Sequence, residues 1–404
     1  MNILEYDVRF LTPAFLGDAE QSGRWRTPPF KALLRQWWRV VYAADHRFDV
    51  DVEAMRREEG LLFGNAWLTH EEESKEVADH TKSLVRLRLS QWTEGRENSK
   101  SWGFKDLDPP SGQRNAKPVK VRHPEVPRPI GPLLYLGYGP LETKRTGQND
   151  WATVLKRRAA IQVGETARLT LAIPSWHPKA DLRDCLGNNV GRIETALALM
   201  NLYATVGGRC RNGWGSFVLK RADNEKASAG EFLLPKRAWR QALRLDWPHA
   251  VGVHDDGRPL IWRTKDSYSN WLDVMRALAI IRIGVRTQFQ FPQRYWLSYP
   301  VTHHVQREWG KNMRLPNSLR FKVRLAPESP EKLIGVIFHM PCLPPNGFKP
   351  DDATVEKTWQ AVHALLDELA NDSGARSYGW IEDFARRDQL KNLLSTVSLV
   401  RVKE

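Results

Sequence analysis

Cationic and aromatic side chains alternate along one face of the segment "TPPFKALLRQWWR", residues 27–39. This pairing suits single-stranded nucleic acid, because cations neutralise phosphates while aromatic rings stack on bases. Two arginines of the preceding loop add to it. We therefore predict an RNA-binding surface that consists of Arg24, Arg26, Lys31, Arg35, Trp38 and Arg39. The alternative is a solvated helix edge on which Trp38 packs beside Arg35.

The same segment has a second, apolar face when its residues are spaced at 100° around a helix. Thr27 is expected as the N-cap and Pro28 as the first helical residue, where a missing N–H breaks no hydrogen bond. The helix should end near Ala44. Its apolar face should bury against a sheet and comprises Phe30, Leu33, Leu34, Trp37 and Val41.

A second basic element is the glycine-rich stretch "VGGRCRNGWG" at residues 206–215. Glycines let the backbone approach a phosphate closely, while Arg209, Arg211 and Asn212 supply two charges and a neutral donor. The stretch lacks the Gly-Lys-Ser/Thr ending of a nucleotide-binding P-loop, which argues against NTP hydrolysis. We expect this turn to lie beside the first helix, so that both basic elements form one RNA-binding groove.

Candidate catalytic residues are few. The pair His303–His304 lies in an aromatic, basic stretch, and one of the two could be a general base for metal-free RNA cleavage. Adjacent residues on a strand point to opposite faces, so the pair does not suit a metal ion. The acidic residues Asp49, Asp51 and Glu53 have no second acidic motif with which to hold two metal ions. We expect a chain with no metal, no cofactor and no catalytic residue.

The chain has 404 residues, of which 41% are hydrophobic, and a formal net charge of +14. The length favours two or three domains with sizeable cores, and the charge favours a polyanionic partner. The three cysteines have neither zinc-site spacing nor a disulfide pattern, which suits a reducing cytoplasm. Apolar runs stay short of the roughly 18 residues that span a membrane, so we expect a soluble protein with no membrane partner.

Hydrophobic periodicity predicts an α+β protein. The expected strands lie at residues 3–11, 83–92, 131–139, 157–174, 214–222, 319–326 and 332–340. The expected helices lie at residues 28–44, 190–206, 268–286 and 353–371. Residues 93–132 are rich in proline, glycine and cations, and they predict either an extended β-arm inserted between core strands or a surface loop.

Two segments share a pattern of glycine, four residues that include arginine, and then Gly-Trp: residues 208–214 and 374–380. Each follows a predicted helix, where glycine suits the left-handed turn that ends it. The repetition indicates duplication of a strand–helix–strand unit, and the element order suits a ferredoxin-like βαββαβ sheet with helices on one face. A polar stretch of small residues near residue 230 predicts the domain boundary.

Four segments together resemble the RAMP superfamily of CRISPR effector proteins: "TPAFLG", "RTPPFKALLRQWWR", "LLFG" and "VGGRCRNGWGSF". The resemblance covers residues 8–67 and 195–218 and is greatest to the family of first subunits of the type III-B Cmr complex. It implies two ferredoxin-like, RRM-like RAMP domains, at residues 1–230 with an insertion at about 68–132, and at residues 231–404. That family often has glycine after the lysine at the position of Lys31, so Ala32 argues against a close backbone approach there.

The resemblance also implies a function. It implies a non-catalytic CRISPR-RNA-binding subunit that holds the 3′ part of the guide RNA, caps the backbone filament and supports antiviral recognition of target RNA. The implied partners are guide RNA, target RNA, the repeated backbone subunit and the other small terminal subunit. The guide-RNA contacts that it implies are Lys31, Arg35, Arg39, Arg209 and Arg211. Two alternatives stay open: a metal-independent endoribonuclease that processes CRISPR transcripts with His303 or His304, and a scaffold that contacts only protein.

Overall fold

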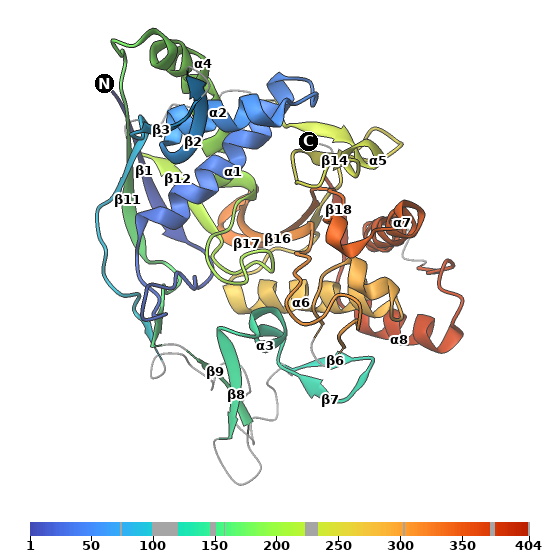
Figure 1. Ribbon diagram of the computed structural model, residues 1–404. Helices are drawn as coiled ribbons and strands as arrows, with labels where there is room; N and C mark the ends of the chain where they lie inside the picture. Colours follow the sequence, from blue (N-terminus) through green and yellow to red (C-terminus); the bar gives the residue numbers. More distant parts are fainter. Residues whose placement is uncertain are drawn as a thin grey trace.

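The computed structural model describes residues 1–72, 75–98, 120–145, 151–156, 158–222, 233–301, 304–371 and 376–402. Helices and strands are mixed along these residues, which confirms the predicted α+β class. Two four-stranded sheets, each with helices packed on it, form the core (Figure 1). Short elements from the middle of the N-terminal half extend below them in the view of Figure 1.

The first sheet consists of β1 (Asn2–Phe10), β4 (Arg86–Leu89), β11 (Thr166–Ile173) and β12 (Phe217–Arg221). Its spatial order is β12-β1-β11-β4, and all neighbours are antiparallel. Numbered along the chain, these four strands lie in the order 4-1-3-2. Val8 and Phe10 are fully buried, as the period-two alternation of β1 predicts.

The core of this sheet is covered by α1 (Thr27–Asp45), α2 (Val52–Phe63) and α4 (Ala180–Tyr203). The predicted apolar face of α1 is buried in full. The N-cap of α1 is Arg26 rather than the predicted Thr27, and Arg26 makes no side-chain cap. Two prolines at the start of the helix lack the N–H that a cap would satisfy, so the helix begins without one.

Two helices differ from the sequence prediction. α2 was not predicted, and its N-cap is Asp51, whose carboxylate accepts from the backbone N–H groups of Glu53 and Ala54. α4 begins ten residues before the predicted residue 190. Its first three turns bury Leu182, Cys185, Leu186 and Asn189, which have helical spacing but are separated by polar residues and a glycine.

The second sheet consists of β15 (Ile261–Thr264), β16 (Leu319–Ala326), β17 (Ser329–His339) and β18 (Leu399–Arg401). Its spatial order is β16-β17-β15-β18, again antiparallel throughout. Read from the other side, the four strands lie in the chain order 4-1-3-2, the same as in the first sheet. Its helices are α6 (Trp271–Thr287), α7 (Asp352–Leu369) and α8 (Phe384–Leu394).

The two glycine-tryptophan segments occupy related places. The first follows α4 and leads directly into β12. The second follows α7 but leads into α8 before β18 begins, and Gly374 and Ala375 lie outside the described residues. In the described part of the second copy, Tyr378 has a φ of 48° and is fully buried.

Between β4 and β11 the chain forms short hairpins and one short helix. These are β6 (Val121–His123) with β7 (Val126–Ile130), α3 (Pro132–Gly137), and β8 (Leu141–Arg145) with β9 (Trp151–Leu155). The prediction of a strand at residues 131–139 is wrong, because most of these residues form α3. Pro132 starts this helix, and Leu133 and Leu136 bury one side of it at helical spacing. Residues 99–119 of the predicted arm lie outside the described residues.

The remaining elements are small. The hairpin of β2 (Asn65–Glu72) and β3 (Lys75–Thr81) follows α2. β5 (Glu97–Asn98) pairs with β10 (Ala159–Ala160), and β13 (Lys236–Ala238) pairs with β14 (Val251–Val253) beside α5 (Trp239–Ala242). Two 3-10 turns, at Gln293–Trp296 and Asn346–Phe348, border an aromatic cluster.

The two sheets meet where β12 and β16 approach each other. The backbone N–H of Phe321 donates to the carbonyl of Arg211 at 3.1 Å, and that of Val323 donates to Ser216 Oγ at 2.8 Å. Beside them, the fully buried Lys322 on β16 crosses to the C-terminal end of α4. The glycine turn of the first half is therefore fixed against the second sheet.

Candidate nucleic-acid interface

Lys31 on α1 faces inward rather than toward solvent. Its ammonium donates to the carbonyl of Phe63 and to Ser83 Oγ, both at 2.9 Å. Burial lowers the pKa of Lys31, and the nearby charge of Arg35 lowers it further. Lys31 therefore joins α1 to the C-terminal end of α2, where a cation is favoured by the exposed carbonyls.

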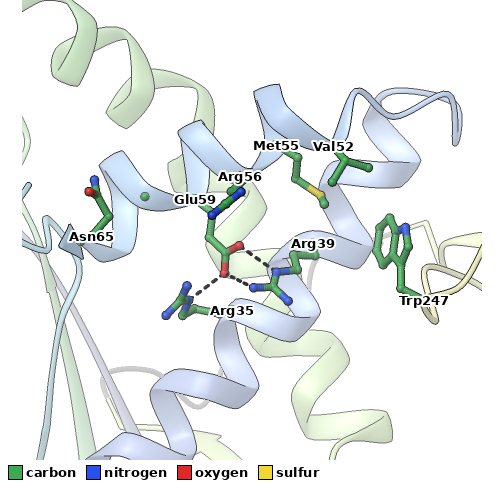
Figure 2. A pocket seen from close by; sticks show the side chains of 10 residues that line it. Arg35, Arg39, Val52, Met55, Arg56, Glu59, Asn65 and Trp247 are labelled. Carbon is green, nitrogen blue, oxygen red and sulfur yellow. Dashed lines mark hydrogen bonds and ion pairs between the residues drawn. The ribbon is translucent and has the colours of Figure 1, made fainter. Parts of the chain in front are cut away.

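Arg35 and Arg39 lie on the same face of α1 and converge on Glu59 of α2 (Figure 2). The hydrogen bonds from these guanidinium groups to the Glu59 carboxylate measure 2.7 and 2.8 Å, and Glu59 is buried. Met55 and Trp247 stand at the other end of the same cavity of about 280 Å³. Two guanidinium groups share one carboxylate here, so this face of α1 keeps a positive charge.

Trp38 does not lie on this face, and the expectation of an exposed stacking ring is wrong. The side chain is fully buried, and its indole N–H donates to Asn189 Oδ1 at 2.6 Å. The ring also packs edge-on against Phe63 of α2 at 6.0 Å. Because α2 and α4 cover this side of α1, a nucleobase cannot reach Trp38.

The loop before α1 is held by its own contacts. Arg24 donates to Asp18 at 3.1 Å, and Arg26 donates to the carbonyl of Gly17. Between them, Trp25 is fully buried and donates to Glu165 at 3.1 Å. The side chain of Arg24 is 44% exposed, and two carboxylates already face its guanidinium, Asp18 at 3.1 Å and Glu94 at 3.9 Å.

The glycine turn separates its three predicted residues. Arg211 donates to the carbonyl of Asn317 at 3.0 Å, and Asn212 is buried and donates to the carbonyl of Leu136 at 2.7 Å. These two bonds fasten the turn to the second half and to α3. Arg209 has a φ of 57° and packs over Gly139, where its guanidinium lies 3.2 Å from the position that a Cβ would take. Burial lowers the pKa of both Arg209 and Arg211.

Arg209 lines a cavity of about 540 Å³. Its walls come from the β6–β7 hairpin, α3, the glycine turn, α6 and the loop that follows α6. Four arginines line this cavity, and among its described lining residues the only carboxylate is Glu125; the arginines are Arg209, Arg282, Arg286 and Arg294. We call it the arginine cavity.

The charges of the arginine cavity are only partly compensated. Arg294 donates to Glu125 Oε2 at 2.7 Å, and Arg286 donates to the hydroxyl of Ser298 at 2.7 Å. Arg282 is only 9% exposed, and its Nη1 has no hydrogen-bond partner among the described residues. Burial lowers the pKa of Arg282 to about 10, and the charges of Arg286 and Arg209 act in the same direction. An anion that enters would relieve this repulsion.

Two histidines and three other rings also line the cavity. His123 and His304 are on opposite segments of the wall, and His304 stacks on Phe291 at 4.2 Å. Burial lowers the pKa of His123; Glu125 opposes this effect, while Arg294 and Arg286 add to it. The other two rings are Tyr135 of α3 and Tyr138, which is 55% exposed. His303, the other predicted histidine, lies outside the described residues.

Sequence reasoning missed Arg282 and Arg286, two of the four arginines that line the cavity. They lie four residues apart, on one face of the otherwise apolar helix α6. Two cations at that spacing inside an apolar helix could have indicated the site, because charged side chains are rarely buried unless they pair with a partner or bind a ligand. The described residues contain no group of three or more His, Cys, Asp or Glu side chains that could hold a metal ion. Within that same part of the chain, helices fall short of the length and apolarity that crossing a membrane requires.

No protein-family profile matches the chain, and no curated protein matches it. Several solved structures are similar to it, among them the following two. One is Cmr1 from Pyrococcus furiosus in its apo form, with 15% identity, a TM-score of 0.42, and coverage of 88% of this chain and 93% of that chain. The other is a type III-B Cmr-beta complex bound to cognate target RNA and AMPPnP in the presence of single-stranded DNA, with 13% identity, a TM-score of 0.45, and coverage of 89% and 99%.

Proposed function

We propose that this chain is a non-catalytic guide-RNA-binding subunit of a type III-B Cmr complex. In this role it holds the 3′ part of the guide RNA and caps the backbone filament, where it supports recognition of target RNA. Its partners are then the repeated backbone subunit and the other small terminal subunit. The sequence resemblance at residues 8–67 and 195–218 supports the family and these partners.

The observation that carries the RNA-binding part of the proposal is the arginine cavity. Four guanidinium groups surround a hollow with a single carboxylate among its described lining residues. Arginine pairs well with phosphate because its planar N–H groups match the phosphate oxygens. Arg35 and Arg39 with the exposed Arg24 extend the basic surface over α1 and the loop before it.

The repeated strand order supports two ferredoxin-like RAMP domains. Each half contains a β-α-β-β-α-β series whose strands lie 4-1-3-2, and each carries additional helices. The additional helices are α2 and the short α3 in the first half, and the short α5 and α8 in the second. A single fold used twice explains why the two glycine-tryptophan segments both follow the second long helix of their half.

The test is RNA binding by the full chain and by the assembled complex. A fluorescent single-stranded RNA should bind with an affinity that falls steeply as salt rises, because phosphate neutralisation releases counterions. Crosslinks within the assembled complex should map to residues 24–39, 207–214 and 282–294. An affinity that does not change with salt, or crosslinks confined to other regions, would contradict the proposal.

A second candidate function is metal-independent RNA cleavage. It is favoured by one observation: His123 and His304 line the same cavity as the four arginines, where one could accept and the other donate a proton. Incubation of the chain with CRISPR repeat RNA in EDTA tests it. Specific cleavage that is lost in both His123→Ala and His304→Ala would replace the non-catalytic role with this one.

A further inference from the structure

We infer that the arginine cavity captures a single nucleotide of single-stranded RNA, with the phosphate on Arg209, Arg282 and Arg286 and the base stacked on Tyr138. The inference rests on the proposed function and specifies how its site recognises the strand. The ligand that it assigns to the cavity is an unstacked nucleotide rather than the side of an RNA double helix.

The position of the phosphate in the cavity follows from three arginines that have no carboxylate partner there. Arg209 comes from the glycine turn, whereas Arg282 and Arg286 come from successive turns of α6. Arg294 is different, because Glu125 already occupies its guanidinium. Arg282 is only 9% exposed, and its Nη1 has no hydrogen-bond partner among the described residues. Burial of such a donor is unfavourable unless a ligand compensates it.

The base end follows from the position of Tyr138. This tyrosine lines the cavity and keeps more than half of its surface exposed, so its ring stands at the rim. It is close enough to Arg209 to influence that residue's pKa electrostatically. The other rings of the lining are already engaged, Phe291 with His304 and Tyr135 with His123. A base can stack on Tyr138 while its phosphate reaches inward.

The size of the cavity selects for a single strand. Its volume of about 540 Å³ lies within the range of small-ligand sites, which is roughly 300–1,000 Å³. A duplex cannot enter such a hollow, and removing a base from a duplex breaks pairing as well as stacking. A single strand gives up only stacking, so it should bind much more tightly than the same sequence in a duplex.

The experiment measures fluorescence anisotropy of a ten-nucleotide RNA, single-stranded or paired with its complement, on the full chain. The cavity variants are Arg209→Gln, Arg286→Gln and Tyr138→Ala. The matched controls are Arg168→Gln, an exposed arginine on β11 that contacts Asp7, and Trp176→Ala, an exposed ring outside the cavity. Each cavity variant should weaken single-strand binding by about tenfold, whereas each control should change it by less than about twofold. Unchanged thermal unfolding of the variants shows that the fold is intact.

The outcomes separate this inference from the function beneath it. If wild type binds single-stranded RNA and the cavity variants match the controls, the inference is wrong and the proposed function stands. Duplex binding as tight as single-strand binding overturns the inference in the same way. If wild type binds neither form, the proposed function fails as well. If AMP binds the cavity but does not displace the RNA even at millimolar concentration, the strand binds elsewhere and strand capture is refuted.

Discussion

Replacing Lys322 with methionine tests how the two sheets are joined. The fully buried ammonium donates to three carbonyls at the C-terminal end of α4: Met200 at 3.2 Å, Asn201 at 2.8 Å and Ala204 at 2.6 Å. It also lies 4.8 Å from the ring centroid of Phe217 on β12. Methionine preserves the length and the apolar stem of the side chain but leaves all three carbonyls without this donor.

The magnitude depends on two opposing effects. A hydrogen bond from a charged donor contributes about 1.5–3 kcal/mol, whereas burial of the ammonium costs several kcal/mol and lowers the pKa of Lys322 well below its usual value. Removal of the lysine recovers the burial cost but takes the donor from the carbonyls of Asn201 and Ala204, at about 1–3 kcal/mol each, while that of Met200 still accepts from the backbone N–H of Ala204. We expect Lys322→Met to lower the free energy of unfolding by about 3 kcal/mol and the melting temperature by roughly 3–4 °C.

Thermal and urea unfolding at neutral pH, followed by circular dichroism, measure this change. Lys220→Met is the matched control, because Lys220 is an exposed lysine on β12, the neighbouring strand. The control should unfold close to wild type, since exposed substitutions away from such contacts change stability by less than about 0.5 kcal/mol. A Lys322→Met protein as stable as wild type would show that the ammonium contributes no net stability, and the reasoning would be refuted.

Three further predictions concern the core and the site. Burial lowers the pKa of His339 to about 3 and that of His363 well below 6.5. The unfolded chain binds protons at these histidines near pH 6.5 and the folded chain does not, so the free energy of unfolding should fall as the pH drops from about 6.5 toward 3. In acid titrations of unfolding, His339→Gln should flatten this dependence. Trp38→Ala should destabilise the fold by about 3–5 kcal/mol in urea titrations without removing an RNA contact from the folded protein. Glu59→Gln should free Arg35 and Arg39, so that RNA binds more tightly by anisotropy; unchanged affinity would place the RNA elsewhere.

The parts of the fold that follow from local pattern could be predicted from the sequence. The apolar face of α1 and the strands β1, β16 and β17 have clear periodicity, and all four are present. α3 could not be identified in this way, because "GPLLYLGYG" is a short apolar run that suits a strand as well as a helix. α4 was shortened in the prediction for a related reason, since glycines and polar residues interrupt its first turns.

The candidate site depended on contacts that are distant in sequence. Trp38 has the spacing of an exposed residue on α1 alone, and only α2 together with Asn189, far along the chain, buries it. Arg282 and Arg286 fall in an apolar helix and join Arg209 only after the two halves dock. The alternation of cations with aromatic rings therefore identified a basic protein. It could not show which cations are free to bind RNA, because burial and ion pairing are tertiary properties.

The contact between β12 and β16 has a consequence for self-association. Two open four-stranded sheets have four edge strands, and each edge presents N–H and C=O groups to which another chain could add a strand. In this protein β12 and β16 are such edges. Phe321 and Val323 of β16 donate to Arg211 and Ser216, in the turn that leads into β12, so this turn covers part of the β16 edge. The other two edges are short: β18 has three residues, and β4 carries the exposed Arg86 and Arg88. The contact between the two sheets thus shields part of the β16 edge, and the charges of β4 and the shortness of β18 disfavour uncontrolled strand addition.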